Sequence, residues 1–168
     1  MVPRFRQSWI DMSKVATKPP TNDLYEVDFY AWTQEQARLL RERRFDDLDL
    51  DNLVDEVESV GRSDKRQIES RLEVLIAHLL KWKLQPGGRG NGWMSTIFEQ
   101  RRRLIRLVED SPSLREFFRQ EVFNSYAAGR LLAAKETGIA FGLFPEECPF
   151  TPEQALDLDY FPEDREIE

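Results

Sequence analysis

Four polar side chains are candidates for chemistry because helical spacing brings them to the edges of a predicted apolar core. Arg71 and His78 lie on one predicted helix, Arg101 on the next and Glu56 on the one before. Arg71 and His78 are two helical turns apart, so their side chains project to nearly the same side. His78 is the only histidine of the chain. A neutral histidine between an acid and two guanidinium groups is able to serve as a general base on a phosphate-containing substrate.

The same four residues also have a structural interpretation, which we favour. Arg101 falls in the middle of an apolar helix face, and burying a charge without a partner is costly. Glu56 lies at the edge of its own apolar face and is the predicted partner of Arg101, with Asp49 as the second choice. Paired in this way, the four residues form a network that fixes the register of the helices.

Arg71, followed after six residues by His78, resembles the arginine–histidine signature of HEPN-type ribonucleases, which are helical bundles with sites formed across a dimer. The resemblance implies that His78 assists attack of the ribose 2′-hydroxyl and that Arg71 holds the phosphate. Leu72 departs from that signature, which usually has a polar residue directly after the arginine.

The sequence predicts neither a metal site nor a bound cofactor. Di-iron bundles use a Glu-x-x-His pair on each of two helices, but Leu75 stands three residues before His78 and Ser59 three residues after Glu56. The glycine-rich loop at 87–92 lacks the lysine and the spacing of a P-loop.

Five helices must position these residues, and they are predicted over 28–43, 49–60, 63–84, 91–109 and 112–136. Asp28 is the predicted N-cap of the first, Gly61 is expected to interrupt or bend the helix between the second and third, and Gly138 to end the fifth. The third has the most extensive apolar face, which consists of Ile68, Leu72, Leu75, Ile76, Leu79 and Trp82.

The predicted fold is all-α: a mainly antiparallel bundle of about five helices, with no strand and no internal repeat. An irregular N-terminal arm over 1–22 precedes a single domain over 23–168. The domain ends in a strap in which Thr151 and Gln154 form a capping box, which predicts one short helix.

Composition limits the class of protein and its partners. The net charge is −7, which argues against a general nucleic-acid binder, although residues 81–106 hold seven basic side chains against one acid. No apolar run approaches the ~20 residues that cross a bilayer, so no membrane association is expected. Cys148 is the single cysteine, so no intrachain disulfide is possible and a cytoplasmic location is expected.

From Tyr25 to about Pro162 the chain resembles a bacterial family catalogued as domain of unknown function number twenty-nine. The likeness is carried by residues 28–82, from DFYAWTQEQ to LIAHLLKW, by IFEQRRRLIRLVEDSPSLR at 97–115 and by FPEECPFT at 144–151. The resemblance implies a helical bundle and a bacterial cytosolic protein. It implies no established reaction, cofactor or catalytic residue.

Two functions follow from these observations. The first is a non-enzymatic helical protein that acts through protein–protein contacts, either as a homo-oligomer or with another protein. Phe5, Trp9 and Ile10 of the N-terminal arm are suited to docking on another chain. The alternative is a HEPN-like ribonuclease, or another phosphate-handling enzyme, that uses His78 and Arg71.

Overall fold

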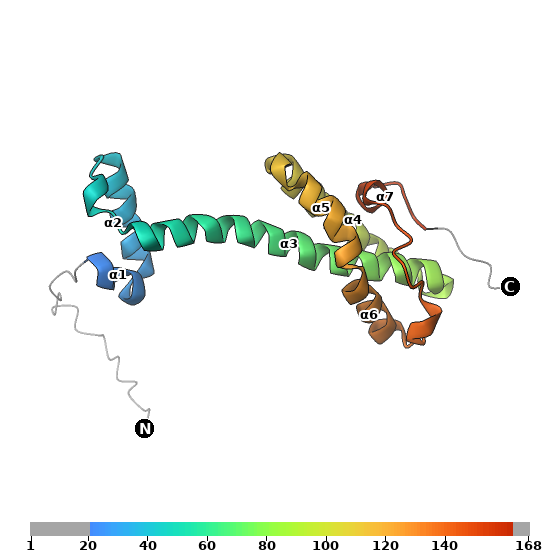
Figure 1. Cartoon of the computed structure of the whole chain (residues 1–168). Helices are drawn as coiled ribbons and strands as arrows, with labels where there is room; N and C mark the ends of the chain where they lie inside the picture. The colour runs from blue at the N-terminus through green and yellow to red at the C-terminus, as the bar shows by residue number, and fades with distance from the viewer. Residues whose placement is uncertain (1–20, 163–168) are drawn as a thin grey trace, which may run out of the picture. The chain divides into compact units, whose positions relative to one another are not determined.

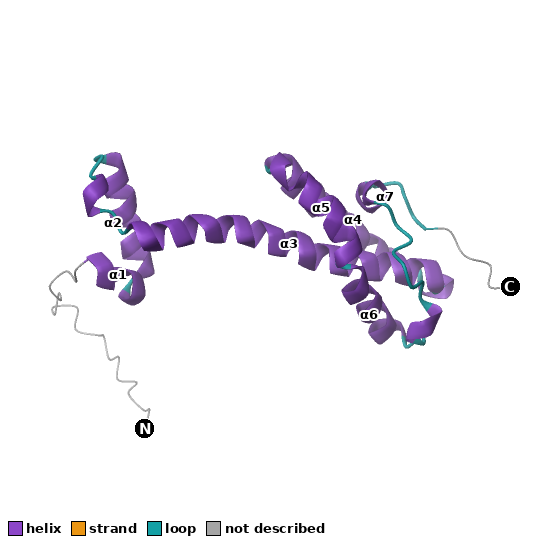
Figure 2. Cartoon of the chain, in the orientation of Figure 1, coloured by secondary structure: helices purple, strands orange, loops and turns teal. Residues whose placement is uncertain are grey.

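The computed structural model describes residues 21–162, with side chains from Leu24 onward, and the chain divides into two compact units, Met1–Glu58 and Ser59–Glu168. The predicted arm over 1–22 lies outside the described residues except for its last two. Helices and connecting loops account for the whole described part, which contains no β-strand (Figure 2). The predicted all-α class is therefore confirmed. None of the described helices is long and apolar enough to cross a lipid bilayer.

The N-terminal unit contains α1 (Thr21–Val27), α2 (Phe29–Arg41), the short 3-10 helix η1 (Phe45–Asp47) and the first residues of α3 (Leu50–Leu84). The predicted N-cap is confirmed, because the Asp28 side chain accepts a hydrogen bond from the backbone N–H of Ala31 at 2.9 Å. Helix α1 was not predicted. Its residue Leu24 is buried, as are Trp32 and Leu39 of α2.

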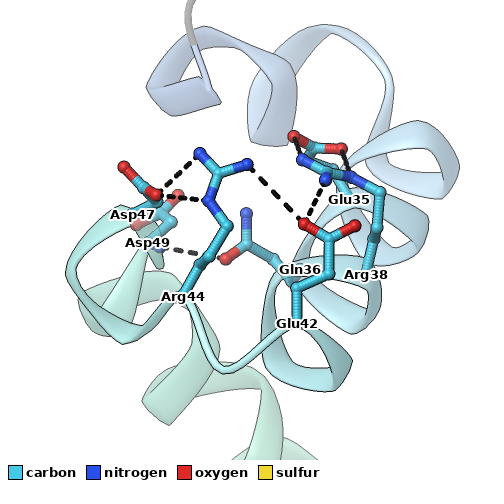
Figure 3. A network of polar contacts seen from close by, with 7 residues as sticks. All are labelled: Glu35, Gln36, Arg38, Glu42, Arg44, Asp47 and Asp49. Carbon is cyan, nitrogen blue, oxygen red and sulfur yellow. Dashed lines mark hydrogen bonds and ion pairs between the residues drawn. The ribbon is translucent and has the colours of Figure 1, made fainter.

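A network of polar contacts links residues of α2 with the segment that connects α2 to α3 (Figure 3). Arg38 and Arg44 share the carboxylate of Glu42, at 2.6 and 3.7 Å. Gln36 is only 2% exposed, and its side-chain carbonyl accepts a hydrogen bond from the backbone N–H of Asp49 at 2.9 Å. Exposed ion pairs contribute only ~0–1 kcal/mol, so the buried Gln36 contact is the stronger restraint on the start of α3.

The C-terminal unit holds the remainder of α3 and the helices α4 (Asn91–Asp110), α5 (Arg115–Asn124), α6 (Tyr126–Thr137) and α7 (Pro152–Leu156). Three 3-10 turns connect them: η2 (Pro86–Gly88), η3 (Pro112–Leu114) and η4 (Phe141–Leu143). Within this unit, α4 to α7 pack around the second half of α3 (Figure 1).

The apolar face predicted for residues 63–84 forms the centre of this core. Five of its six residues are completely buried, and Trp82 is partly buried against them. Residues of the following helices, including Ile97, Leu104 and Phe118, belong to the same core and pack with this face. A helix with so broad a buried face must have neighbours on several sides, as the sequence pattern indicated.

Two predicted boundaries are wrong and two are confirmed. Gly61 does not interrupt the chain, because α3 is a continuous helix of 35 residues. The helix predicted over 112–136 is divided at Ser125 into α5 and α6. Gly138 ends α6 in the left-handed region with φ of 72°, and the Thr151–Gln154 capping box begins α7.

Candidate functional site

Helix α3 carries Arg71, His78 and Lys81 in the C-terminal unit. Arg71 and His78 are partly buried at the edge of its buried face, beside Leu75, and Lys81 is itself buried. Arg71 and His78 are two turns apart, or about 10 Å along the helix axis, so each makes its own set of contacts.

His78 is a half-buried, neutral imidazole with both ring nitrogens engaged. Its Nδ1 lies 2.8 Å from the backbone carbonyl oxygen of Val74, which only accepts, so Nδ1 carries the proton. Nε2 is then the acceptor, and it lies 3.5 Å from Nζ of Lys81. Burial lowers the pKa of His78 below its ordinary 6.5, and the nearby Lys81 lowers it further; the Val74 hydrogen bond and the charge of Glu136 act in the other direction.

Sequence reasoning missed two residues of this site, Lys81 and Glu136. Lys81 is a buried residue, and its Nζ forms an ion pair of 2.7 Å with Glu136 of α6. The same Nζ lies 4.7 Å from the centre of the Trp93 ring, a cation–π contact. The hydrogen bond from Lys81 lowers the pKa of the Glu136 carboxyl. An ammonium group paired in this way has no lone pair for nucleophilic attack.

The lowered pKa of His78 predicts a pH dependence of stability. The unfolded chain binds a proton at His78 near pH 6.5, whereas the folded chain resists it, so stability falls as the pH drops below about 6.5. We expect the parent to lose more free energy of unfolding than His78→Gln between about pH 7.5 and about pH 5.5. Urea unfolding of both proteins at the two pH values measures the difference. Equal losses would contradict the buried, neutral state of His78.

Arg71 faces a different partner and a cavity. Its Nη1 donates a hydrogen bond to the side-chain carbonyl of Gln100 on α4 at 3.2 Å. Its Nε is buried and has no hydrogen-bond partner among the described residues. Burial lowers the pKa of Arg71, and the positive charge of Arg103 adds to this effect.

Arg101 is completely buried, as predicted, but its predicted partners are wrong. Its Nε and Nη2 donate hydrogen bonds of 3.1 Å to the backbone carbonyls of Ala155 and Gln154. These carbonyls belong to the last turn of α7, where helical carbonyl groups lack intrahelical partners and carry partial negative charge. Desolvation lowers the pKa of Arg101, and its guanidinium carbon lies 5.6 Å from the centre of the Phe161 ring.

The acids proposed for Arg101 have other contacts within the N-terminal unit. Glu56 accepts a hydrogen bond from the hydroxyl of Tyr25 at 2.7 Å. Asp49 accepts one from the indole N–H of Trp32 at 3.1 Å and another from Asn52 at 2.8 Å. The predicted quartet of Glu56, Arg71, His78 and Arg101 is therefore not a single network. Among the described residues, no three His, Cys, Asp or Glu side chains are grouped so that they could hold a metal ion.

Comparison with known proteins identifies the family of the chain. No curated protein and no solved structure matches the chain. The sequence model of one family, described as Domain of unknown function DUF29, matches residues 24–161, which include parts of both units. With this span of more than half its length, the chain belongs to the DUF29 family, as the resemblance of its helical segments indicated.

Proposed function

We propose that the protein is a non-enzymatic helical protein that acts through protein–protein contacts, and that its N-terminal unit carries the contact surface. The observation that carries the proposal is that more large apolar side chains are exposed to solvent than are buried in this part of the chain. Among the described residues of this unit, three large apolar side chains are buried, whereas eight are exposed. The exposed ones are Val27, Phe29, Tyr30, Leu40, Phe45, Leu50, Val54 and Val57. Such a ratio of exposed to buried apolar side chains is typical of a small unit that completes its apolar core with another chain.

Three of these residues form a stripe along the first turns of α3. Leu50, Val54 and Val57 are 56%, 55% and 68% exposed, and their spacing of four and three residues places them on one side of the helix. A helix face with an apolar residue in every turn is suited to bind an amphipathic segment.

The charge of the unit indicates the chemistry of its partner. Residues 21–58 contain twelve acidic and four basic residues, a net charge of −8. Opposite charge at the rim of an apolar contact speeds association and excludes wrong partners. The partner segment should therefore be basic and apolar.

Residues 1–20 of a second copy of the chain match this description, and we assign them as the occupant of the surface. They hold four basic residues and one acid, together with Phe5, Trp9 and Ile10. Pro19 and Pro20 separate this segment from α1 in the sequence.

Sedimentation equilibrium of the full chain over a series of protein concentrations tests the proposal. We expect the parent to form a dimer, and Val54→Glu/Val57→Glu and Phe5→Ser/Trp9→Ser to sediment as monomers. Leu131→Glu is the matched control, since Leu131 is an exposed apolar residue of α6 that should leave the dimer intact. A monomeric parent, or arm and stripe variants with the mass of the parent, would overturn the proposal.

A cytoplasmic location is part of the same proposal. It is supported by the presence of a single cysteine, Cys148, whose thiol is partly buried. Burial raises the pKa of this thiol and so favours the less reactive protonated form.

The ribonuclease alternative has less support from the contacts of its two proposed residues. His78 directs Nδ1 at a backbone carbonyl and Nε2 at Lys81, so neither nitrogen is directed at the contacts of Arg71. A general base has to be within hydrogen-bond reach of the proton that it takes.

A further inference from the structure

A cavity of about 350 Å³ lies beside Arg71 on the surface of the C-terminal unit. Apart from one valine, its lining is polar, and every polar residue is basic or neutral. These residues are Ser63, Arg66, Gln67, Ser70, Arg71 and Gln100. The chain as a whole has 31 acidic and 24 basic residues, so a lining with two arginines and no acid departs from its average composition. By contrast, the cavity that contains Arg115 and Arg119 also contains Glu153.

The positive charge of Arg71 is incompletely compensated by the protein. Its one hydrogen bond among the described residues goes to a neutral amide, that of Gln100, and its Nε is buried without a partner. Burial and the charge of Arg103 both disfavour the protonated guanidinium and so lower its pKa, while the more weakly coupled Glu99 acts in the opposite sense. A bound anion would replace the lost hydration of Arg71 and offset the repulsion from Arg103.

We propose that this cavity binds the phosphate group of a small phosphate monoester, with Arg71 as the anchoring residue. This inference is independent of the proposed function, because it concerns a separate surface. Two guanidinium groups, two serine hydroxyls and two glutamine amides line the cavity, and this number of donors suits the three terminal oxygens of a phosphate monoester better than the two oxygens of a carboxylate.

The size and setting of the cavity favour a small ligand over a polymer. Sites for small molecules occupy about 300–1,000 Å³, so this cavity falls at the lower end of that range. The net charge of −7 opposes a nucleic acid, whose affinity depends on many phosphate contacts. At physiological ionic strength, charges beyond about 8 Å are screened, so the distant acidic residues of the chain contribute little to the potential at the cavity.

The test is a titration of the ¹⁵N-labelled full chain with glycerol 3-phosphate and with inorganic phosphate, followed by NMR at constant ionic strength. We expect amide shifts confined to residues 63–74 and to the neighbourhood of Gln100, and saturation by both phosphates. Acetate, a carboxylate, should cause no saturable shift. Arg71→Met should weaken binding at least tenfold. Arg119→Met, which removes an arginine from the other cavity, should leave binding unchanged.

A second variant keeps the test decisive if Arg71→Met does not fold. Ser70 is exposed, so Ser70→Asp should fold normally while placing a carboxylate at the cavity, and it should abolish binding of both phosphates. Equal binding by the parent and Ser70→Asp would overturn the proposal. Saturation by acetate, or phosphate-induced shifts that map to other residues, would do the same.

Discussion

Replacing Arg101 by methionine is expected to lower the free energy of unfolding by about 3 kcal/mol. The variant loses two charge-assisted hydrogen bonds and leaves the carbonyls of Gln154 and Ala155 without those donors. Hydrogen bonds from a charged group contribute about 1.5–3 kcal/mol each, which sets the scale of the loss. Two effects make this loss of stability smaller than the sum of two such bonds. Methionine has no charge to desolvate, and the parent protein already bears the cost of burying Nη1 of Arg101 without a partner.

Arg102→Met is the matched control for this prediction. Arg102 is the next residue of α4, its side chain is 68% exposed, and it pairs with Glu99 at the surface. Loss of such a pair changes stability by less than about 1 kcal/mol. Urea unfolding of both variants gives the two values, and hydrogen exchange at the amides of α7 should increase only in Arg101→Met. If the two variants were equally stable, the hydrogen bonds of Arg101 to α7 would not contribute to the fold.

The case of Arg101 shows which part of a buried contact is readable from sequence. Its position on an apolar helix face correctly predicted burial. The sequence predicts an acid as its partner, because a carboxylate is visible in a sequence as a counter-charge. The partners are instead backbone carbonyls of α7, and every residue has a carbonyl. Only the placement of the last turn of α7 beside α4 distinguishes these two.

Local signals predicted helix ends well and helix continuity poorly. Asp28, Gly138 and the Thr151–Gln154 box act through atoms within a few residues, so the sequence contains the whole interaction. The sequence predicts that Gly61 interrupts or bends a helix, but a glycine within a helix costs only about 1 kcal/mol relative to alanine. The helix formed by the residues on both sides outweighs that cost, and α3 continues through it.

The contents of the candidate site were predictable only in part. Lys81 lies three residues after His78, which is a neighbouring position on a helix surface, and this spacing was a usable signal. Its partner Glu136 is 55 residues away and had no such signal. The two meet because α6 packs against α3, and that packing depends on a small residue, Gly129.

Replacing Gly129 by leucine is expected to lower the free energy of unfolding by about 3 kcal/mol. A side chain at this position has no room, since a Cβ atom would lie 2.7 Å from Cγ2 of Ile76 and 3.0 Å from the backbone oxygen of Glu73. Ile76 is completely buried, so it cannot move aside without disturbing the core. Leucine has a higher helix propensity than glycine, and this difference offsets no more than about 1 kcal/mol of the loss.

Alanine substitutions at two helical glycines provide the matched comparison. Gly129→Ala should be destabilising, because even a methyl group meets Ile76 and Glu73. Gly61→Ala should raise the free energy of unfolding by up to about 1 kcal/mol, because no atom lies within 4 Å of the added Cβ and alanine is the better helix former. The same substitution therefore has opposite signs at the two positions, and chemical denaturation of the pair measures both.

Gly129→Ala should also change the environment of His78. The substitution increases the spacing between α3 and α6, and these two helices hold the Lys81–Glu136 ion pair. A wider spacing of α3 and α6 admits water to the half-buried imidazole, which removes part of the desolvation that lowers its pKa. An NMR titration of the His78 ring should therefore give a higher pKa in Gly129→Ala than in the parent, and an unchanged one in Gly61→Ala. A variant with parental stability and a parental His78 pKa would show that the approach of the two helices at Gly129 does not determine the environment of the site.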